Sequence, residues 1–304
     1  MKNTIRIILT TILIVGINSF LQPANAQDSL LVTESVETMS QGRQNGFQVI
    51  IPRNTAKDAE SLWKKFLKDE TKSSVKKEYN EMTVHDAILN SFGSEPVSIY
   101  AAFKEADGRA MLSAFFCGAD SVFFTSAKHE SQSVSAKLLV RNFAVYAYKD
   151  GVSNFLKTET KKLNDLEDGL KELEKSISNS ENAIKKNDRE IERQKDDIKT
   201  LQTQEEFLTA EVIKQKQLLT TFSGSPEARK IDEEKLKDLE KDKKKVTKEI
   251  EKANRKIDNL EDDTRSHEKS IDNNKTKSIP EKTAEINSQK EVVKKIEDLL
   301  ESIR

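Results

Sequence analysis

The sequence predicts an α+β protein: a small antiparallel-sheet/helix head domain followed by a long antiparallel two-helix coiled-coil hairpin. Three observations predict this. Aromatic residues are concentrated in the first half, and only Phe207 and Phe222 occur after Phe155. An apolar heptad begins near the same point. A Ser-Gly-Ser-Pro turn at 223–226 then divides the heptad region into two arms. A globular core needs bulky side chains and a two-helix seam does not, so the boundary falls near Phe155.

The N-terminus has the pattern of an export signal over residues 1–26. Basic Lys2 and Arg6 precede an apolar run, which ends before a small-residue cleavage site at 24–26. The alternative is an uncleaved membrane anchor, but the run is short for the ~20 residues of a span and contains Asn18. No later stretch is apolar enough to span a bilayer. We therefore expect an exported protein, periplasmic or extracellular, with no transmembrane span after signal removal.

Composition limits the classes of partner. Charged residues make up 34% of the chain, yet the formal net charge is only -1 because opposite charges interleave. No large field of one sign is expected, which argues against nucleic acid as a partner. The single cysteine, Cys117, excludes an internal disulfide, so the head must be stabilised by burial. A head of this size, residues 27–152, is long enough to fold alone.

The pattern of the head predicts several strands and one helix, followed by a last helix. A helix over 56–68 is capped by Asn54 or Thr55 and places Trp63 in an apolar stripe that faces the core. Asp107-Gly108 marks a tight hairpin between two strands, the second of which is central. A turn is expected at 41–46. The strands expected are 30–38, 47–51, 75–84, 97–103 and 110–116, with a short final strand at 122–124.

From about Glu130 the apolar period becomes helical, and we expect this helix to cover the head and continue past Gly151 into the first arm, 153–222. Apolar residues then recur at strict sevens, with a second series three places later. Such an a/d pattern keeps an apolar seam against a partner helix. The first series consists of Leu163, Leu170, Ile177, Ile184, Ile191 and Ile198.

The second arm, 227–304, continues the seam, and its similar length favours a hairpin within one chain. Reflection about the 224–225 turn places Leu163 opposite Ile286 and brings Ile303 beside Tyr146. The C-terminal turn should therefore pack against the last helix of the head. We therefore favour a monomeric hairpin. The alternative is a homodimer in which the helices of two chains pair in parallel.

Two features interrupt the seam. Ser180, Asn187 and Gln194 take three successive d positions, where polar side chains lower stability but can fix register. We expect this middle part to be the most flexible. After Asn273-Asn274, the sevens resume one residue out of phase, and Pro280 should kink or restart the helix.

No catalytic constellation is recognisable. Cys117, His85 and His129 are the residues that could suggest thiol catalysis, but core packing is the expected role of Cys117. The histidines lack metal-ligand spacing and no phosphate-binding loop is present, so we expect no metal and no cofactor. The candidate partner contact is the hairpin tip. Its residues are Leu218, Leu219, Phe222 and Gly224, whose alternative role is apolar closure of the hairpin end.

The stretch from Tyr79 to Asp86, followed by a two-strand hairpin and a helix entering the coiled coil, resembles uncharacterised exported α+β head plus coiled-coil proteins of Bacteroidota-type bacteria. The resemblance implies a bacterial envelope setting and no activity. The expected function is that of a non-enzymatic structural or interaction protein, in which the head docks or binds and the coiled coil serves as spacer or protein-partner surface. The alternative is a small-molecule-binding or enzymatic head whose coiled coil serves oligomerisation.

Overall fold

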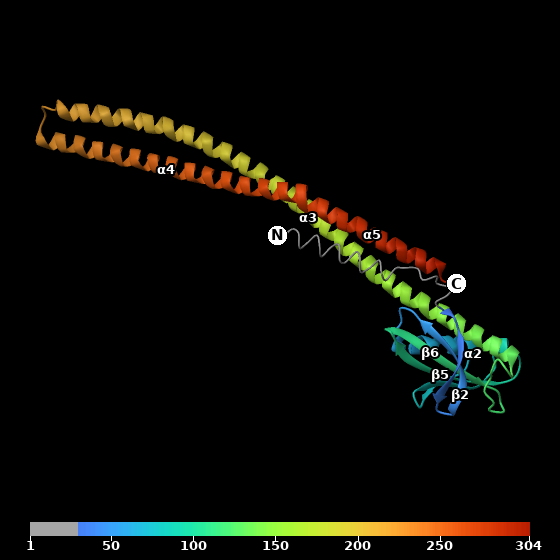
Figure 1. Ribbon diagram of the computed structural model, residues 1–304. Helices are drawn as coiled ribbons and strands as arrows, with labels where there is room; N and C mark the ends of the chain where they lie inside the picture. The colour runs from blue at the N-terminus through green and yellow to red at the C-terminus, as the bar shows by residue number, and fades with distance from the viewer. Residues whose placement is uncertain (1–29) are drawn as a thin grey trace. The chain divides into compact units, whose positions relative to one another are not determined.

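The computed structural model describes residues 30–304, so the expected signal segment 1–26 lies outside the described residues. The predicted fold class is confirmed: a six-stranded antiparallel sheet is followed by long helices (Figure 1). The chain divides into two compact units. The first contains the described residues up to Asn164 together with Asn287–Arg304, and the second is Asp165–Ile286.

The sheet of the first unit has the strand order β1-β2-β6-β5-β4-β3, and all neighbours are antiparallel. The predicted central strand is β6, which lies between β2 and β5 and has buried residues on both faces. Asp107 and Gly108 form the expected tight turn between β5 and β6. The strands are β1 (Thr33–Met39), β2 (Gly42–Ile51), β3 (Lys76–Glu78), β4 (Glu81–Ala87), β5 (Val97–Ala106) and β6 (Arg109–Cys117).

Three predictions about where strands and turns begin and end were wrong. The turn expected at 41–46 is confined to its start, because β2 already begins at Gly42. Gly46 lies inside β2, where a Cβ atom would come within 2.7 Å of the Phe115 ring. The single strand expected at 75–84 is split by a turn in which Tyr79 and Asn80 have φ of 49° and 69°. The strand expected at 122–124 is reduced to one bridge between Cys117 and Phe123.

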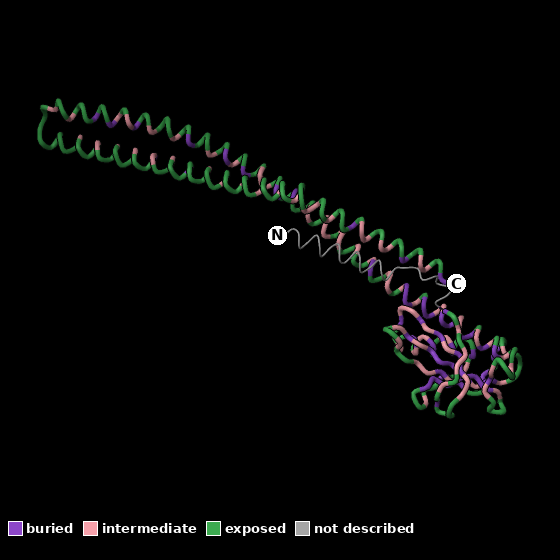
Figure 2. The backbone as a smooth tube through the Cα atoms, in the orientation of Figure 1, coloured by how far each residue is buried: buried purple, intermediate pink, exposed green. Residues whose placement is uncertain are grey.

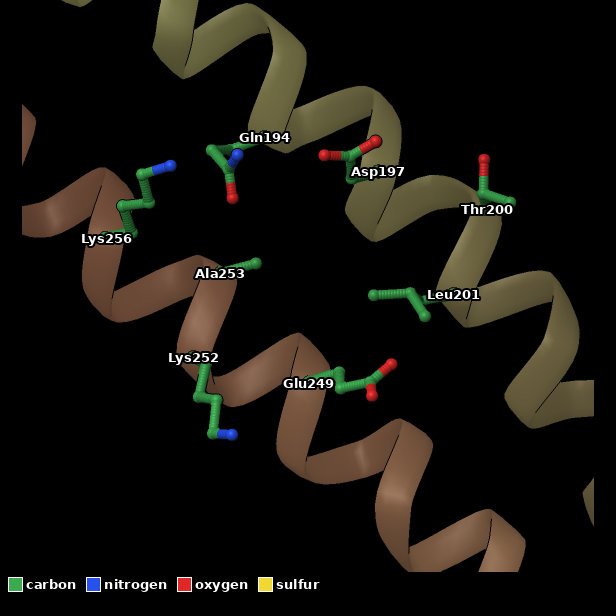
Figure 3. Close-up of a pocket in the computed structure, with 8 residues that line it drawn as sticks. All are labelled: Gln194, Asp197, Thr200, Leu201, Glu249, Lys252, Ala253 and Lys256. Atoms are coloured by element: carbon green, nitrogen blue, oxygen red, sulfur yellow. The ribbon is translucent and has the colours of Figure 1, made fainter.

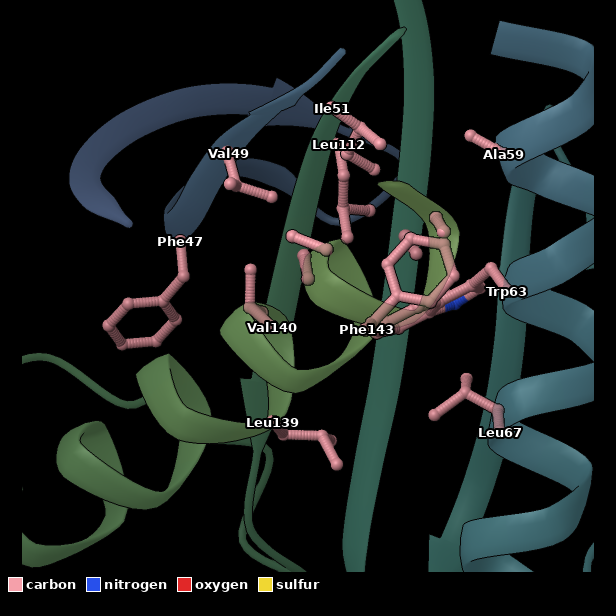
Figure 4. Close-up of a cluster of buried hydrophobic side chains, with 14 of the residues drawn as sticks. Phe47, Val49, Ile51, Ala59, Trp63, Leu67, Leu112, Leu139, Val140 and Phe143 are labelled. Atoms are coloured by element: carbon pink, nitrogen blue, oxygen red, sulfur yellow. The ribbon is translucent and has the colours of Figure 1, made fainter. Parts of the chain in front are cut away.

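Helix α2 (Ala56–Thr71) and the first turns of α3 (Glu130–Thr220) supply the apolar side chains that fill one face of the sheet. The predicted cap is Thr55, whose Oγ1 accepts a hydrogen bond from the Asp58 amide at 3.1 Å. Trp63 is fully buried, and its ring meets that of Phe143 edge to face at 4.7 Å. Figure 4 shows these two rings between α2, α3 and the sheet. Trp63 therefore has the core role that its stripe predicts.

The second face of the sheet is closed by a polar contact between distant strands. Glu81, at the start of β4, is 5% exposed and accepts hydrogen bonds from the amide and hydroxyl of Ser40 at 2.8 and 2.7 Å. Ser40 follows β1, and three strands separate β1 from β4 in the sheet order. The sheet must therefore curl for these ends to meet. Phe115 and Thr83, both buried, fill this face.

Three contacts attach α3 to the loop before α2. A Cβ atom at Gly151 would lie 2.4 Å from the backbone oxygen of Arg53, so only glycine permits this approach. Asn54 is 5% exposed and donates a hydrogen bond to the Ala147 carbonyl at 2.8 Å. The guanidinium of Arg53 lies 4.3 Å above the centre of the Phe155 ring. Gly151 thus belongs to a tight junction and does not interrupt the helix.

The C-terminal turn packs on the head, as the reflected heptad predicts. Ile296, in α5 (Ile279–Ser302), and Ile303 are 0% and 2% exposed and belong to the same apolar core as Phe143. Within the first unit, the Gln289 amide group also donates to the Glu159 carbonyl at 3.0 Å. Reflection places residue 290 opposite Glu159, so the observed pairing agrees within one residue.

The second unit is an antiparallel helical hairpin. Its helices are the part of α3 from residue 165, α4 (Pro226–Asn273) and the start of α5. Ser225 caps α4 by accepting a hydrogen bond from the Ala228 amide at 3.3 Å, and Pro226 starts the helix as predicted. Gln215 donates to Asp232 at 3.0 Å across the pair. Figure 2 shows the less exposed residues on the facing sides and the exposed ones outside.

The phase shift near the end of α4 has a local structural cause. Residues Asn274–Ser278 form a π-helix, which is wound more widely than the α-helix on either side. Such a turn inserts an extra residue, and Ile279 follows Ile271 by eight positions in place of seven. The insertion keeps Ile279 half-buried on the seam. It also precedes Pro280, which cannot donate the backbone hydrogen bond of a regular helix.

Candidate functional site

The expected tip residues separate into two groups. Leu219 and Phe222 are half-buried, and the Phe222 ring lies over Gly224, where a Cβ atom would come within 2.7 Å of it. These residues close the end of the hairpin. Leu218 is 50% exposed and is the one apolar member of the group that faces solvent. Of the predicted site, Leu218 is therefore the side chain that can contact another molecule through an apolar surface.

Two large apolar residues near the tip were missed by the sequence analysis. Phe207 is 64% exposed and Ile231 is 68% exposed. In the heptad of α3, Phe207 is at position c and Leu218 at g, which are neighbours around the helix. Ile231 is at position c of α4, and an antiparallel pair places the g-side positions of both helices together. We call Phe207, Leu218 and Ile231 the distal apolar side.

A signal for this side is present in the sequence. Phe207 directly precedes the seam residue Leu208, so it cannot also face the partner helix. Ile231 likewise precedes Asp232, the residue that pairs with Gln215 across the seam. A search for bulky residues outside the a and d positions would have found both. Ile213, 52% exposed, is at position b and lies on the other side of the hairpin.

The grooves between the two helices are shallow and have charged rims. One hollow of about 450 Å³ has Leu201 and Ala253 at its floor and Asp197, Glu249 and Lys252 around it (Figure 3). A second hollow of about 480 Å³ lies closer to the tip. Such open, charged grooves differ from the enclosed, mainly apolar pockets that hold small ligands.

Ion pairs cross these grooves and stabilise charged forms. Lys256 lies 2.5 Å from a carboxylate oxygen of Glu190, which Arg193 also contacts. Hydrogen bonds from Lys256 and Arg193 hold the pKa of Glu190 below its ordinary value. Lys216 and Glu240 form a similar pair at 2.7 Å. These charges satisfy one another across the hairpin, as e and g residues do in coiled coils.

The surroundings of Cys117 do not favour a nucleophilic thiol. Burial raises its pKa, and the carboxylates of Asp120 and Asp86 raise it further. The reactive form of cysteine is the thiolate, which such surroundings disfavour. A catalytic cysteine instead sits beside a cation or a helix N-terminus. Cys117 is 4% exposed and fits the packing role that the sequence predicts.

Neither candidate histidine hydrogen-bonds to this thiol. His85 makes a 3.4 Å contact with Glu78 and an edge-on ring contact with Tyr100 at 5.7 Å. His129 lies against the Phe124 ring, and its Nδ1 accepts a hydrogen bond from the Thr125 amide at 3.4 Å. Tyr100 lies near Cys117. Burial is the largest cause of the raised pKa of Tyr100, and the charge that Cys117 can carry is the second. Cys117 and Tyr100 are therefore packed side chains near the end of a strand.

Within residues 30–304, His, Cys, Asp and Glu side chains nowhere gather in threes in a way that could hold a metal ion. Across the same range, none of the helices is both long and apolar enough to cross a membrane. The chain matches no protein family, no curated protein and no solved structure.

Proposed function

We propose that this is a non-enzymatic exported structural or interaction protein of the bacterial cell envelope, acting in the periplasm or outside the cell. In this proposal the head docks or binds, and the coiled-coil hairpin serves as spacer and as the surface for a protein partner. The observation that carries it is the distal apolar side. It consists of large apolar residues that are half to two-thirds exposed, although the seam beside them is satisfied within the chain.

The charge pattern of α3 near the tip supports the proposal. Between residues 200 and 220 the helix has only five charged residues, whereas charged residues make up 34% of the whole chain. Protein interfaces are depleted in charge at their centre and enriched in aromatic residues, and Phe207 provides such an anchor. Leu218 and Ile231 extend the same side over both helices. A protein partner with an apolar helix or groove would cover this side.

The export part of the proposal is supported by the sequence pattern of residues 1–26. Fractionation of cells that express the full chain tests it directly. Recovery of a shortened chain beginning at Gln27 in the periplasm or the medium is expected. A chain of full length in the cytoplasm would contradict export.

The test of the partner surface is a matched pair of variants. In the first, Phe207→Gln and Leu218→Gln remove two members of the distal apolar side. In the control, Val134→Gln and Leu138→Gln change two residues of α3 in the head that are 61% and 51% exposed. Both pairs retain helix-forming residues and replace two exposed apolar side chains.

Cross-linking in cells, followed by quantitative mass spectrometry of the captured proteins, gives the readout. At least one envelope protein should be cross-linked by the natural chain and the control but lost, by about tenfold or more, from the first variant. Equal recovery by all three chains would exclude the distal apolar side as the contact. Circular dichroism of both variants confirms that helix content is unchanged.

A further inference from the structure

The outer face of α4 near the tip carries an unusual row of cations. Residues 235–256 contain ten Lys or Arg and five Asp or Glu, an excess of five positive charges in a chain whose net charge is -1. Most of the excess lies at the outward b, c and f positions of the heptad. Six exposed lysines stand at these outward positions, and we call them the lysine face. They are Lys237, Lys241, Lys244, Lys245, Lys248 and Lys252.

These lysines are largely unpaired. Only Lys245 has a carboxylate within 4 Å, at Asp242, and the other five form no ion pair with any residue in the described range 30–304. By contrast, Lys216 and Lys256, which lie beside the seam, pair across the hairpin at 2.7 and 2.5 Å. The acidic residues of this segment lie mostly at e and g positions, where they face the neighbouring helix. Over 237–255 the outward b, c and f positions hold seven cations and two acidic residues, Asp238 and Glu251, the second of which pairs with Arg255.

The opposite helix shows that this is not a general property of the hairpin. At the b, c and f positions of α3 between 192 and 217, three basic and three acidic residues balance. Those positions also include uncharged Thr203, Phe207 and Ala210. A row of like charges on one helix raises its own free energy through repulsion. An anionic partner that spans the row would relieve this repulsion.

We propose that the lysine face of α4 binds a linear anionic polysaccharide of the cell envelope. The row extends over about 22 Å at 1.5 Å per residue, with successive lysines at most four residues apart. Flexible, strongly hydrated ammonium groups suit repeated contacts with a polymer, whereas fixed carboxylates of a protein partner are recognised better by arginine. Lysine is also depleted from protein–protein interfaces.

The composition of the face favours a polysaccharide over other polyanions. Single-stranded nucleic acids are bound by aromatic side chains that stack on the bases, and the lysine face contains none. A helix that lies on a membrane inserts an apolar face beside its cations. The apolar side of α4 instead faces the seam, where Val246 and Ala253 are 5% and 8% exposed.

The test compares two triple variants of the full protein. The first is Lys241→Gln, Lys244→Gln and Lys248→Gln, in the centre of the lysine face. The control is Lys186→Gln, Lys199→Gln and Lys269→Gln, three exposed lysines scattered along the same hairpin. Both remove three charges and retain residues with good helix propensity. Thermal melting by circular dichroism checks that both hairpins remain folded.

Binding is measured by fluorescence anisotropy with labelled polygalacturonate, at several salt concentrations. Neutral dextran, vesicles containing phosphatidylglycerol and a single-stranded oligonucleotide are the comparison probes. The natural protein and the control should bind polygalacturonate, and the first variant should bind about tenfold more weakly or worse at low salt. The slope of log affinity against log salt should become shallower by about two, since each lost contact contributes roughly 0.7.

Four results would overturn the proposal. They are equal weakening by both triple variants, no binding of polygalacturonate by the natural protein at low salt, tighter binding of vesicles, and tighter binding of the oligonucleotide. The distal apolar side provides a check on independence. The Phe207→Gln and Leu218→Gln variant should retain polygalacturonate binding, so failure of the proposed protein contact and failure of this inference are distinguishable.

Discussion

The head and the hairpin bury their apolar side chains to different extents. In the head, Trp63, Phe143 and Phe47 are completely removed from solvent. In the hairpin of the second unit, the most buried seam residues, such as Val246 and Ile191, retain 5% and 7% exposure, and most of the others are only half-buried. A three-dimensional core therefore stabilises the head, whereas each layer of the hairpin depends on its immediate neighbours. Substitutions should cost most in the head and act locally in the hairpin.

The largest expected effect is from Phe143→Ala. Removal of a fully buried ring that packs against Trp63 and Phe66 should lower the free energy of unfolding by about 3–5 kcal/mol. Trp63 is the only tryptophan, so its fluorescence reports the unfolding of the head in denaturant. Val134→Ala, on the exposed side of the same helix, is the control and should have little effect. A loss of less than about 1 kcal/mol would contradict the proposed difference between the units.

Two glycines within helices sharpen the comparison. Gly151→Ala should destabilise the protein by about 1–3 kcal/mol, because the new methyl group meets the Arg53 backbone oxygen at 2.4 Å. Gly169→Ala in the hairpin should instead stabilise by about 0.5–1 kcal/mol, since its nearest neighbour is the end of the Lys282 side chain at 3.9 Å. Denaturant titration followed by circular dichroism measures both. Stabilisation by Gly151→Ala, as expected for Gly169→Ala, would show that Gly151 has no packing role.

Gly151 also illustrates where prediction from sequence reaches its limit. The heptad series predicts the hairpin, its register and the docking of Ile303, because a seam is a periodic property of consecutive residues. The need for glycine at 151 depends on Arg53, almost a hundred positions earlier, whose approach no local pattern records. The split at Tyr79-Asn80 was missed for a different reason. Neither residue is glycine, although both have positive φ.

The candidate site was predicted in part for similar reasons. Leu218 was found because it is close to the turn. Phe207 and Ile231 stand at c positions, outside the a/d series that predicts the hairpin, so the seam pattern does not reveal them. The lysine face was hidden by composition, since interleaved charges along the sequence sort onto separate helix faces only when the heptad is applied. Net charge alone could not reveal it.

The middle of the hairpin should open more easily than its ends. Asn187 is 8% exposed and donates to Asp263 at 3.2 Å and Thr264 at 3.3 Å, so a polar layer replaces an apolar one. The neighbouring Ser180 is equally buried. Hydrogen exchange should therefore give less protection at 180–194 than at 201–212 within the second unit, by about tenfold or more. Greater protection in the middle would contradict a stabilising role for apolar layers.

The variant Asn187→Leu tests the same layer from the other direction. An apolar residue at this d position should raise the stability of the middle segment by about 1 kcal/mol. The protection of its amides against hydrogen exchange measures this gain. It should also weaken the restriction on register, since Asn187 no longer pairs with Asp263. Double electron–electron resonance between spin labels near residues 201 and 250 then should show a broader distance distribution. An unchanged distribution would assign the register to the remaining polar contacts, such as Gln215 with Asp232.

The smallest expected effect is the pH dependence that Cys117 gives to the head. Burial and two nearby carboxylates raise the pKa of the thiol in the folded protein. The unfolded chain therefore releases its thiol proton first, at about pH 8.5, and stability should fall as pH rises above that value. Cys117→Ala removes this contribution, so its stability should be flatter between about pH 8 and 10. The raised pKa of Tyr100 acts in the same direction at higher pH, and burial, the largest cause of that shift, remains in both proteins. The thiol is not the titrating group if the stability of the natural protein rises with pH, or if Cys117→Ala shows an equal decline. Rapid alkylation of Cys117 at pH 8 in the folded state would contradict its burial.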